Sequence, residues 1–511
     1  MRPLRWFPFR KRRGRWSRCI SRSWLPREEK NMFNKLRPVW LVARRELRDQ
    51  FRDWRVLLPM LILTLCFPFL MNEFAKETVD YLNQFNANLV LERLVPISIM
   101  IIGFFPITVA LVVALESFVG EKERGTIEPL LTAPFDDWQL YFGKLLVGAI
   151  TPLIASYTSI GLYLWMIHRQ GLTFPDGMVM LQLMLLTTAH AVVMVSAAIV
   201  ISVQSTSVKA ANLLASFIVI PVAILMQGEA VMLFWGNETV LWLGIAGVVI
   251  IAVLLIRVGI AHFEREYLLG REIDTLNLKW IARTFWRNFT GGAVSLWDWY
   301  RRAVMSSLRR IFSAFLIMVV VAAVSLWLSY DWVMVNVSDA VSRASPEALK
   351  KVEENIEELP EFSSMSGHLD ASFLFLNNTR SMATILLAGL TSFGVLGVMI
   401  YMLNIGLIGG VYALFKLLGV SPLPIFLAGI LPHGIFEIPA LMIGSAAVLY
   451  IGAVIVTPQT GKSMGEVILE MMADWAKLFV GVVVPLLAVA ALIEAYVTPV
   501  LLLRVLGGGM R

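Results

Sequence analysis

Charged residues are scarce in this sequence. Of 511 residues, only 16% are Asp, Glu, Lys or Arg, whereas 58% are hydrophobic, and the mean hydropathy is +0.72. Soluble domains carry about 25% charged residues, so this composition excludes an ordinary soluble protein. Cysteine is scarcer still, because Cys19 and Cys66 allow no disulfide framework. Cys66 lies inside an apolar run and is expected to be a small buried hydrophobic residue.

The first 31 residues lack the apolar segment of a secretory signal peptide. They hold eleven Lys and Arg, which favours a disordered basic arm near anionic lipid headgroups. The alternative is a misassigned start codon, with Met32 as the true start.

Six apolar runs occupy the first half of the chain, at 54–71, 94–118, 145–167, 179–203, 211–227 and 239–261. About twenty apolar residues are long enough to cross a hydrocarbon core of roughly 30 Å as a helix. The alternating pattern of a membrane barrel is absent, so only helices satisfy the backbone groups within lipid. The sequence therefore predicts an all-α polytopic membrane protein that begins with a six-span bundle.

The loops between these runs differ in basic residues. Twenty Lys and Arg lie in 32–55, 119–144, 204–210 and 262–310, against three in 72–93, 168–178 and 228–238. Lys and Arg are enriched in cytoplasmic loops. The N-terminus and 119–144 are therefore predicted to be cytoplasmic, in a multi-pass protein of the inner (cytoplasmic) membrane.

One of these predicted cytoplasmic loops, GEKERGTIEPLLTAPFDDWQLYFGK at 120–144, holds five acids and three bases. Followed by its apolar run, it resembles the signature of ABC type-2 permeases, the membrane subunits of ATP-driven exporters. The match is carried by Glu121, Lys122, Glu123, Gly125, Thr126, Glu128, Leu130, Pro134, Gly143 and Lys144. QSTSVKAAN (203–211) and FEREYLLGR (263–271) are also similar to that family, so the resemblance covers residues 32–274.

The resemblance implies that this loop couples the chain to a separate ATPase subunit, and that the chain forms a homodimer with two such subunits. A short helix along the inner surface can transmit the motion of a partner to the flanking spans. Gly125 permits a tight turn, and the mixed charges are expected to form ion pairs at the rim of the partner. The alternative is that these charges only keep a loop solvated.

The chain has no phosphate-binding loop of its own. TPQTGKS at 457–463 lacks the first glycine of G-x-x-x-x-G-K-[ST], because Val456 stands at that position. ATP hydrolysis is therefore expected in another polypeptide. No cofactor and no nucleic-acid partner are expected; the expected partners are the ATPase, a second copy and the lipid bilayer.

Aromatic and basic residues alternate in 275–310, which is too polar to span a membrane. The aromatic residues are Trp280, Trp286, Trp297, Trp299 and Tyr300, and Arg283, Arg287, Arg301 and Arg302 lie among them. Amphipathic rings beside cations suit the headgroup layer, so we expect interfacial helices broken at Gly291–Gly292. A soluble pair of linker helices is the alternative.

The remaining domain, 311–511, is expected to form a second bundle of about five spans or re-entrant helices. It opens with an apolar span at 311–329 and continues with an exterior acidic helix at 346–359. The blocks 382–418 and 423–457 are too long for one crossing and contain Gly and Pro, which predicts broken or re-entrant helices. A last span is expected at 477–503.

This domain is similar to the stage II sporulation protein M family, over about 311–505. The match is carried by Asn378, Gly389, Gly394, Gly397, Asn404, Gly406, Gly410, Pro432, His433, Gly434, Glu437, Pro439 and Glu494. Those membrane proteins are best known as part of a peptidoglycan-remodelling complex. The resemblance therefore implies a second possible function, that of a membrane scaffold or envelope-remodelling protein.

Four polar residues of this domain form a predicted intramembrane cluster: Asn404, His433, Glu437 and Glu494. Each costs about 3 kcal/mol to place in the bilayer on insertion scales. A helix that starts at Pro432 would place His433 and Glu437 on one face, with Glu494 in the middle of the last span. They either satisfy one another structurally or form a protonation-sensitive pair. No metal is expected, because two or three ligands are an incomplete set and HGIFE is not H-E-x-x-H.

Overall fold

In the computed structural model, the described residues are 32–83, 88–127, 132, 134–170, 174–205, 207–235, 238–261, 263, 278–338, 370–457 and 464–508. Within these ranges the regular elements are helices, and nine of them are long and apolar enough to cross a membrane. The predicted all-α polytopic architecture is confirmed. The basic arm at 1–31 and the acidic helix at 346–359 lie outside the described residues.

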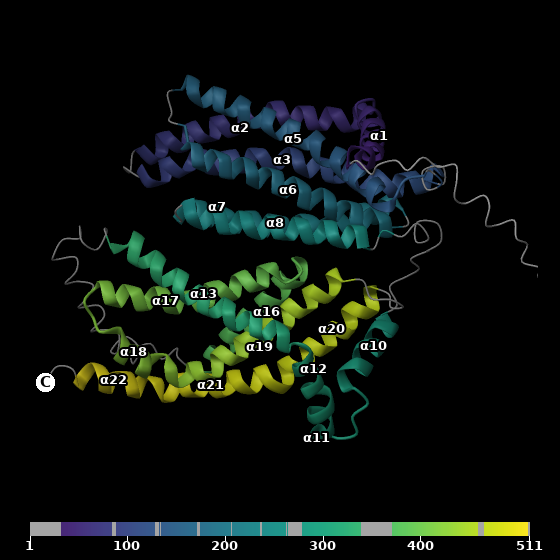
Figure 1. The fold of residues 1–511 in the computed structure, drawn as a ribbon. Helices are drawn as coiled ribbons and strands as arrows, with labels where there is room; N and C mark the ends of the chain where they lie inside the picture. The colour runs from purple at the N-terminus through teal and green to yellow at the C-terminus, as the bar shows by residue number, and fades with distance from the viewer. Residues whose placement is uncertain are drawn as a thin grey trace, which may run out of the picture.

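Seven helices form the first half: α1 (Met32–Gln50), α2 (Trp54–Asn83), α3 (Asn88–Glu123), α5 (Asp137–Arg169), α6 (Gly177–Gln204), α7 (Val208–Trp235) and α8 (Glu238–Ala261). Each of the six predicted apolar runs lies in one helix, from α2 to α8. These six helices run side by side, and α1 lies across one end of them (Figure 1). Five of the six have the length and hydropathy of a full span, whereas α7 contributes a shorter apolar helix, Ile218–Phe234.

Local signals set the starts of two of these helices. At the start of α5, Gln139 Oε1 accepts a hydrogen bond from the Asp136 N–H (2.9 Å). At the start of α6, Asp176 Oδ2 accepts from the Met178 N–H (3.0 Å). Both contacts satisfy N–H groups that a helix leaves without an intrahelical partner. The start of α5 fixes where the polar connection after α3 ends.

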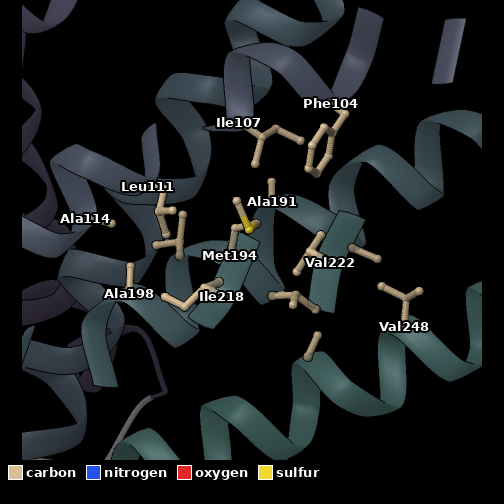
Figure 2. Packing of buried hydrophobic residues seen from close by; sticks show 14 of the residues in the cluster. Phe104, Ile107, Leu111, Ala114, Ala191, Met194, Ala198, Ile218, Val222 and Val248 are labelled. Atoms are coloured by element: carbon tan, nitrogen blue, oxygen red, sulfur yellow. The ribbon is translucent and has the colours of Figure 1, made fainter. Parts of the chain in front are cut away.

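The core of the first half lies between α3, α5, α6, α7 and α8. Leu111, Met194, Ile218 and Val248 are among its buried members, and Figure 2 shows how side chains from α3, α6, α7 and α8 interdigitate. The opposite arrangement holds on α2, where many large apolar side chains are exposed, as expected of a lipid-facing helix. Cys66 is exposed on this helix, so the prediction of a buried cysteine was wrong.

The second half begins with α10 (Leu278–Thr290), α11 (Leu296–Asp298), the π-helix η2 (Trp299–Val304), α12 (Met305–Arg310) and α13 (Phe312–Asn336). It continues with α16 (Ala371–Thr391), α17 (Val395–Leu417), α18 (Pro422–Gly429), α19 (Leu431–Val456), α20 (Met464–Leu478), the π-helix η3 (Phe479–Val483), α21 (Val484–Tyr496) and α22 (Thr498–Gly508). The chain turns after α10 at Gly291 and Gly292, whose φ angles are +60° and +72°. This is the position at which the sequence predicts a break.

The two long apolar blocks of this half are interrupted, as predicted. The first ends its helix at Thr391 and resumes at Val395, and the second is divided at Ile430 between α18 and α19. Among the described residues, four helices of this half have the length and hydropathy of a span, and α18 and α22 are short helices that contact each other.

The prediction of a last span at 477–503 was wrong. The helix runs from Met464 to Tyr496 through α20, η3 and α21, and Val497 interrupts it before α22. The predicted start lies after Asp474, at Lys477, and both residues are polar in the sequence, whereas the helix begins ten residues before Asp474. Both side chains are buried in an ion pair inside the bundle.

The two halves contact each other through α8, which packs against α17 and α19. In Figure 1, α8 is the helix of the first half that lies next to the second half. Phe393, Val395 and Leu396, from the turn between α16 and α17, pack against the core of the first half. The halves are therefore joined by side-chain packing as well as by the chain.

Candidate functional site

The loop predicted at 120–144 begins inside a helix. α3 continues through Glu123, and the chain then turns at Gly125, whose φ is +66°. The Thr126 N–H donates to the Glu121 carbonyl (3.0 Å), which closes the turn. Because few residues other than glycine adopt this φ without strain, Gly125 fixes where α3 ends.

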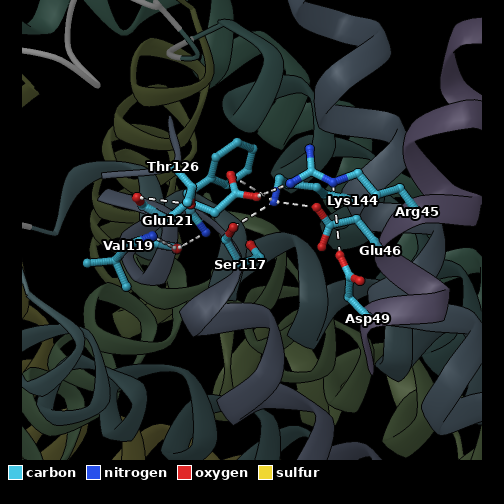
Figure 3. A network of polar contacts seen from close by, with 10 residues as sticks. Arg45, Glu46, Asp49, Ser117, Val119, Glu121, Thr126 and Lys144 are labelled. Carbon is cyan, nitrogen blue, oxygen red and sulfur yellow. Dashed lines mark hydrogen bonds and ion pairs between the residues drawn. The ribbon is translucent and has the colours of Figure 1, made fainter. Parts of the chain in front are cut away.

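Lys144, at the start of α5, is the centre of a buried polar network. Its Nζ donates to Glu46 Oε1 (3.0 Å) and to the Ser117 carbonyl (2.6 Å), and it lies 3.4 Å from Glu121 Oε2. The Lys144 side chain is 1% exposed, and its ammonium lies 4.6 Å from the Phe118 ring centroid. A buried charge is stable only when it is paired and hydrogen-bonded, so this lysine holds α1, α3 and α5 together (Figure 3).

α1 is docked to this network by two further features. Arg45 Nη2 lies 3.8 Å from Glu121 Oε1, and Arg45 Nε lies 3.9 Å from Asp49 Oδ2. A Cβ on Gly143 would lie 2.7 Å from Val42 of α1, which is shorter than carbon atoms can approach. Gly143 therefore permits the close contact between α1 and α5, and the adjacent Lys144 supplies the charge that fixes it.

The other two charges of the motif bind the connection between α6 and α7. Lys122 Nζ donates to the carbonyls of Val203 (2.7 Å) and Ser205 (3.2 Å). Glu123 Oε1 accepts from the Val208 N–H (2.8 Å) at the start of α7, where a carboxylate is favoured by the helix dipole. These two charges therefore make contacts within the chain, and the expected ion pairs with a partner stay a prediction.

The remaining predicted residues of the loop differ in position. Thr126 and Pro134 are exposed, as is Gly125. Glu128 and Leu130 lie outside the described residues, as does most of the short helix that we expected there. Among the described residues of the loop, the turn around Gly125 and the segment at Pro134 are therefore exposed.

In the second half, the structure brings together three of the four predicted polar residues. Pro432 lies in the first turn of α19, and His433 Nε2 lies 3.9 Å from Glu437 Oε2 on the same face. One ligand atom each from His433, Glu437 and Glu494 lies within 4.8 Å of the other two. His433 Nδ1 is also 3.2 Å from Thr498 Oγ1, a contact that the sequence did not predict.

Two details of that prediction were wrong. Glu494 lies in the last turn of α21, which ends at Tyr496, rather than in the middle of a span. Asn404 is exposed on α17, and its Nδ2 donates to the Ile400 carbonyl (2.9 Å) of its own helix. The three clustered residues therefore lie at helix ends.

The permease-like half also contains a buried ionisable pair that was not predicted from the sequence. His190 of α6 lies 3.5 Å from Glu229 of α7, between Nε2 and Oε1, and their side chains are 4% and 2% exposed. Each is an isolated ionisable residue within an apolar helix, and this is the signal that could have found them. The pair links two helices of the core.

A second missed network lies in the other half. Asp474 of α20 accepts hydrogen bonds from Arg310 Nη1 (2.7 Å) and Ser307 Oγ (3.0 Å) of α12. Lys477 Nζ lies 2.5 Å from Asp474 Oδ1. The members of this network come from segments more than 160 residues apart, so no local sequence pattern predicts the network.

The helices and these buried charges define an integral, multi-pass membrane protein with two helical halves. Residues 40–338 match the family described as "ABC-2 family transporter protein". The chain belongs to this family, and it is therefore a transport component of the membrane rather than the site of ATP hydrolysis.

The second half has its own match, because residues 311–499 match the family described as "Stage II sporulation protein M". Both predicted resemblances are confirmed, although the first match continues to 338 rather than ending near 274. The chain is also similar to the uncharacterised protein MJ0793 of Methanocaldococcus jannaschii. The two are 32% identical over 127 residues, which are 24% of this chain and 68% of that protein.

Proposed function

We propose that this chain is the membrane subunit of an ATP-driven exporter, and that it is moved by a separate ATPase subunit. The family match supports a permease, and the sequence holds no phosphate-binding loop. In this proposal the ATPase contacts the exposed turn around Gly125 and the segment at Pro134. A homodimer with two ATPase subunits completes the transporter.

The Lys144 network is the observation that carries this proposal. Glu121 is one turn from Gly125 and is held by Lys144 and Arg45, so a push on the turn moves α1, α3 and α5 as one body. Lys122 and Glu123 extend the same connection to the ends of α6 and α7. An exposed turn whose neighbouring side chains are paired with buried charges is suited to transmit rigid-body motion.

The distribution of basic residues supports the orientation of the proposal. The end of the molecule with α1 and the Gly125 turn also carries α10, α11 and α12 (Figure 1), and these segments hold most of the basic residues of the loops. We therefore place this end, with the N-terminus, on the cytoplasmic side of the inner membrane.

The test separates docking of the ATPase from transmission of its motion. The chain is reconstituted in liposomes with the ATPase that co-purifies with it, and both binding and ATPase stimulation are measured. Gly125→Val distorts the contact surface, so it is expected to weaken binding and abolish stimulation. Glu121→Lys leaves the exposed surface in place but breaks the network, so it is expected to abolish stimulation while the ATPase remains bound.

Arg302→Gln is the matched control, because Arg302 is 77% exposed at the same end of the molecule, in the second half. It is expected to change neither quantity. Normal stimulation by both Gly125→Val and Glu121→Lys would remove the coupling assignment. Co-purification of cell-wall hydrolases without any ATPase would favour the scaffold or envelope-remodelling function of the second half.

A further inference from the structure

The cluster of His433, Glu437 and Glu494 combines an imidazole with two carboxylates at one point of the second half. His433 and Glu437 come from the first two turns of α19, and Glu494 comes from the last turn of α21. Their three ligand atoms lie within 4.8 Å of one another. The sequence alone predicted no metal, because three ligands do not complete a tetrahedral set. Imidazole and carboxylate are nevertheless ligands of Zn²⁺ and similar cations, and sites with three protein ligands hold water in the fourth position.

The charges of the cluster are not balanced by the protein. Among the described residues, neither carboxylate forms an ion pair with Lys or Arg, and Glu437 pairs only with His433. Two carboxylates in a largely apolar helix bundle repel each other and are costly to leave unpaired. A divalent cation would neutralise both of them and still leave the imidazole neutral, as metal coordination requires.

The hydrogen bond from His433 to Thr498 orients the imidazole for this role. When Nδ1 carries the proton, it donates to Thr498 Oγ1 at 3.2 Å, and the lone pair of Nε2 then faces Glu437 Oε2 at 3.9 Å. Metal-binding histidines are held in this way, by a hydrogen bond from the nitrogen that does not bind the metal. Thr498 is the first residue of α22, so this contact connects α19 to the chain directly after the helix interruption at Val497.

The distances suit one ion after a small movement of the side chains. Ligand atoms at about 2.1 Å from a tetrahedral metal lie about 3.4 Å from one another, so the three side chains need to close by little more than about 1 Å. The His433 and Glu437 side chains are 13% and 22% exposed, which leaves a path for an ion to enter.

We propose that His433, Glu437 and Glu494 bind one divalent transition-metal cation of the Zn²⁺ class, with Thr498 as a positioning residue. The bound cation clamps the start of α19 to the end of α21. Asp474 and Glu494 are twenty residues apart on one helix, a distance of about 30 Å at 1.5 Å per residue. The metal site therefore lies at the opposite end of this helix from the Asp474 network.

The test uses the full chain without a polyhistidine tag, stripped of metal in detergent and titrated with Co²⁺. Wild type is expected to bind one Co²⁺ per chain, with visible d–d absorption that Zn²⁺ abolishes by displacement. His433→Gln, Glu437→Gln and Glu494→Gln are each expected to lose this absorption. Thr498→Val keeps all three ligands and is expected to weaken binding by roughly 10- to 100-fold.

His168→Gln, at the end of α5, is the control for histidine replacement and is expected to bind like wild type. Size-exclusion elution of each variant in detergent establishes that it is folded.

For any variant that does not fold, Zn²⁺-dependent protection of wild type from thermal unfolding provides the second measurement. A folded wild type that binds no stoichiometric Co²⁺ or Zn²⁺ overturns the proposal, and so does undiminished binding by all three glutamine variants. If wild type binds no stoichiometric Co²⁺ or Zn²⁺, the three side chains bind protons and no metal ion.

Discussion

Each half of the molecule holds a network of charged side chains near the same end, and the residues at the two centres, Lys144 and Asp474, have opposite signs. In the first half, the cation Lys144 lies between Glu46 and Glu121. In the second half, the anion Asp474 lies between Arg310 and Lys477. The first network joins α1 to α3 and α5, and the second joins α12 to α20.

The two networks differ in their access to water. Lys144 is 1% exposed and its acidic partners Glu46 and Glu121 are 17% and 15% exposed, whereas Arg310 is 44% exposed. If the first network opens, a buried charge loses its partners; if the second opens, Arg310 can be solvated or can turn to Glu470, 3.7 Å away. The first network therefore holds its helices together rigidly, which suits the transmission of motion. The second network holds its helices less rigidly.

The largest effect is expected for Lys144→Met, which leaves Glu46 and Glu121 without the cation between them. Removing one partner of a buried pair costs about 3–5 kcal/mol, so the free energy of unfolding in detergent should fall by that amount. Lys76→Met is the control, because Lys76 pairs with Glu73 at 2.6 Å but both are well exposed, and such pairs contribute about 0–1 kcal/mol. An equal decrease in the free energy of unfolding of the two variants would show that the Lys144 network does not hold the helices together.

A smaller loss is expected for Asp474→Asn, which keeps the shape of the side chain and removes its charge. Hydrogen bonds to charged groups contribute about 1.5–3 kcal/mol, and the exposed part of Arg310 limits the loss to the lower part of this range. The measurement is again denaturant unfolding, with Asp298→Asn, whose partner Arg302 is exposed, as the control. A loss larger than that of Lys144→Met would reverse the comparison.

Glu123→Gln is expected to have a still smaller effect, because a glutamine carbonyl can still accept from the Val208 N–H. Only the charge at the N-terminus of α7 is lost, and this contributes about 0.3–1 kcal/mol. Faster amide hydrogen exchange at Val208, with unchanged exchange in the middle of α3, is the expected signature. Unchanged exchange at Val208 would mean that Glu123 does not hold α7.

The smallest effect on stability is expected at the surface of α10. Trp286 is 62% exposed, whereas the indole of Trp299 donates to the Phe289 carbonyl at 2.8 Å. A nitroxide on Trp286→Cys, in a chain whose native cysteines are replaced, should report the depth of the lipid headgroups and leave the unfolding free energy nearly unchanged. A label in bulk water would show that α10 is part of a soluble linker.

Hydropathy predicted the helices well because most of their residues meet lipid or an apolar core. Hydropathy found the six runs of the first half, whereas the glycine pair indicated the break at Gly291–Gly292 and Pro432 indicated the start of a helix. The two buried networks of charged residues were not predictable from the sequence. Their members are far apart along the chain and meet only in the folded protein, as Glu46 meets Lys144 and Arg310 meets Asp474. The predicted start of the last span, which lies beside Asp474, was wrong.

The contact of α8 with the second half couples the two halves at one small residue. A Cβ on Gly247 would lie 2.7 Å from the sulfur of Met399 in α17, so a larger residue at 247 requires the end of the Met399 side chain to move. The size of the residue at 247 in the first half and the packing of Met399 in the second half are therefore interdependent.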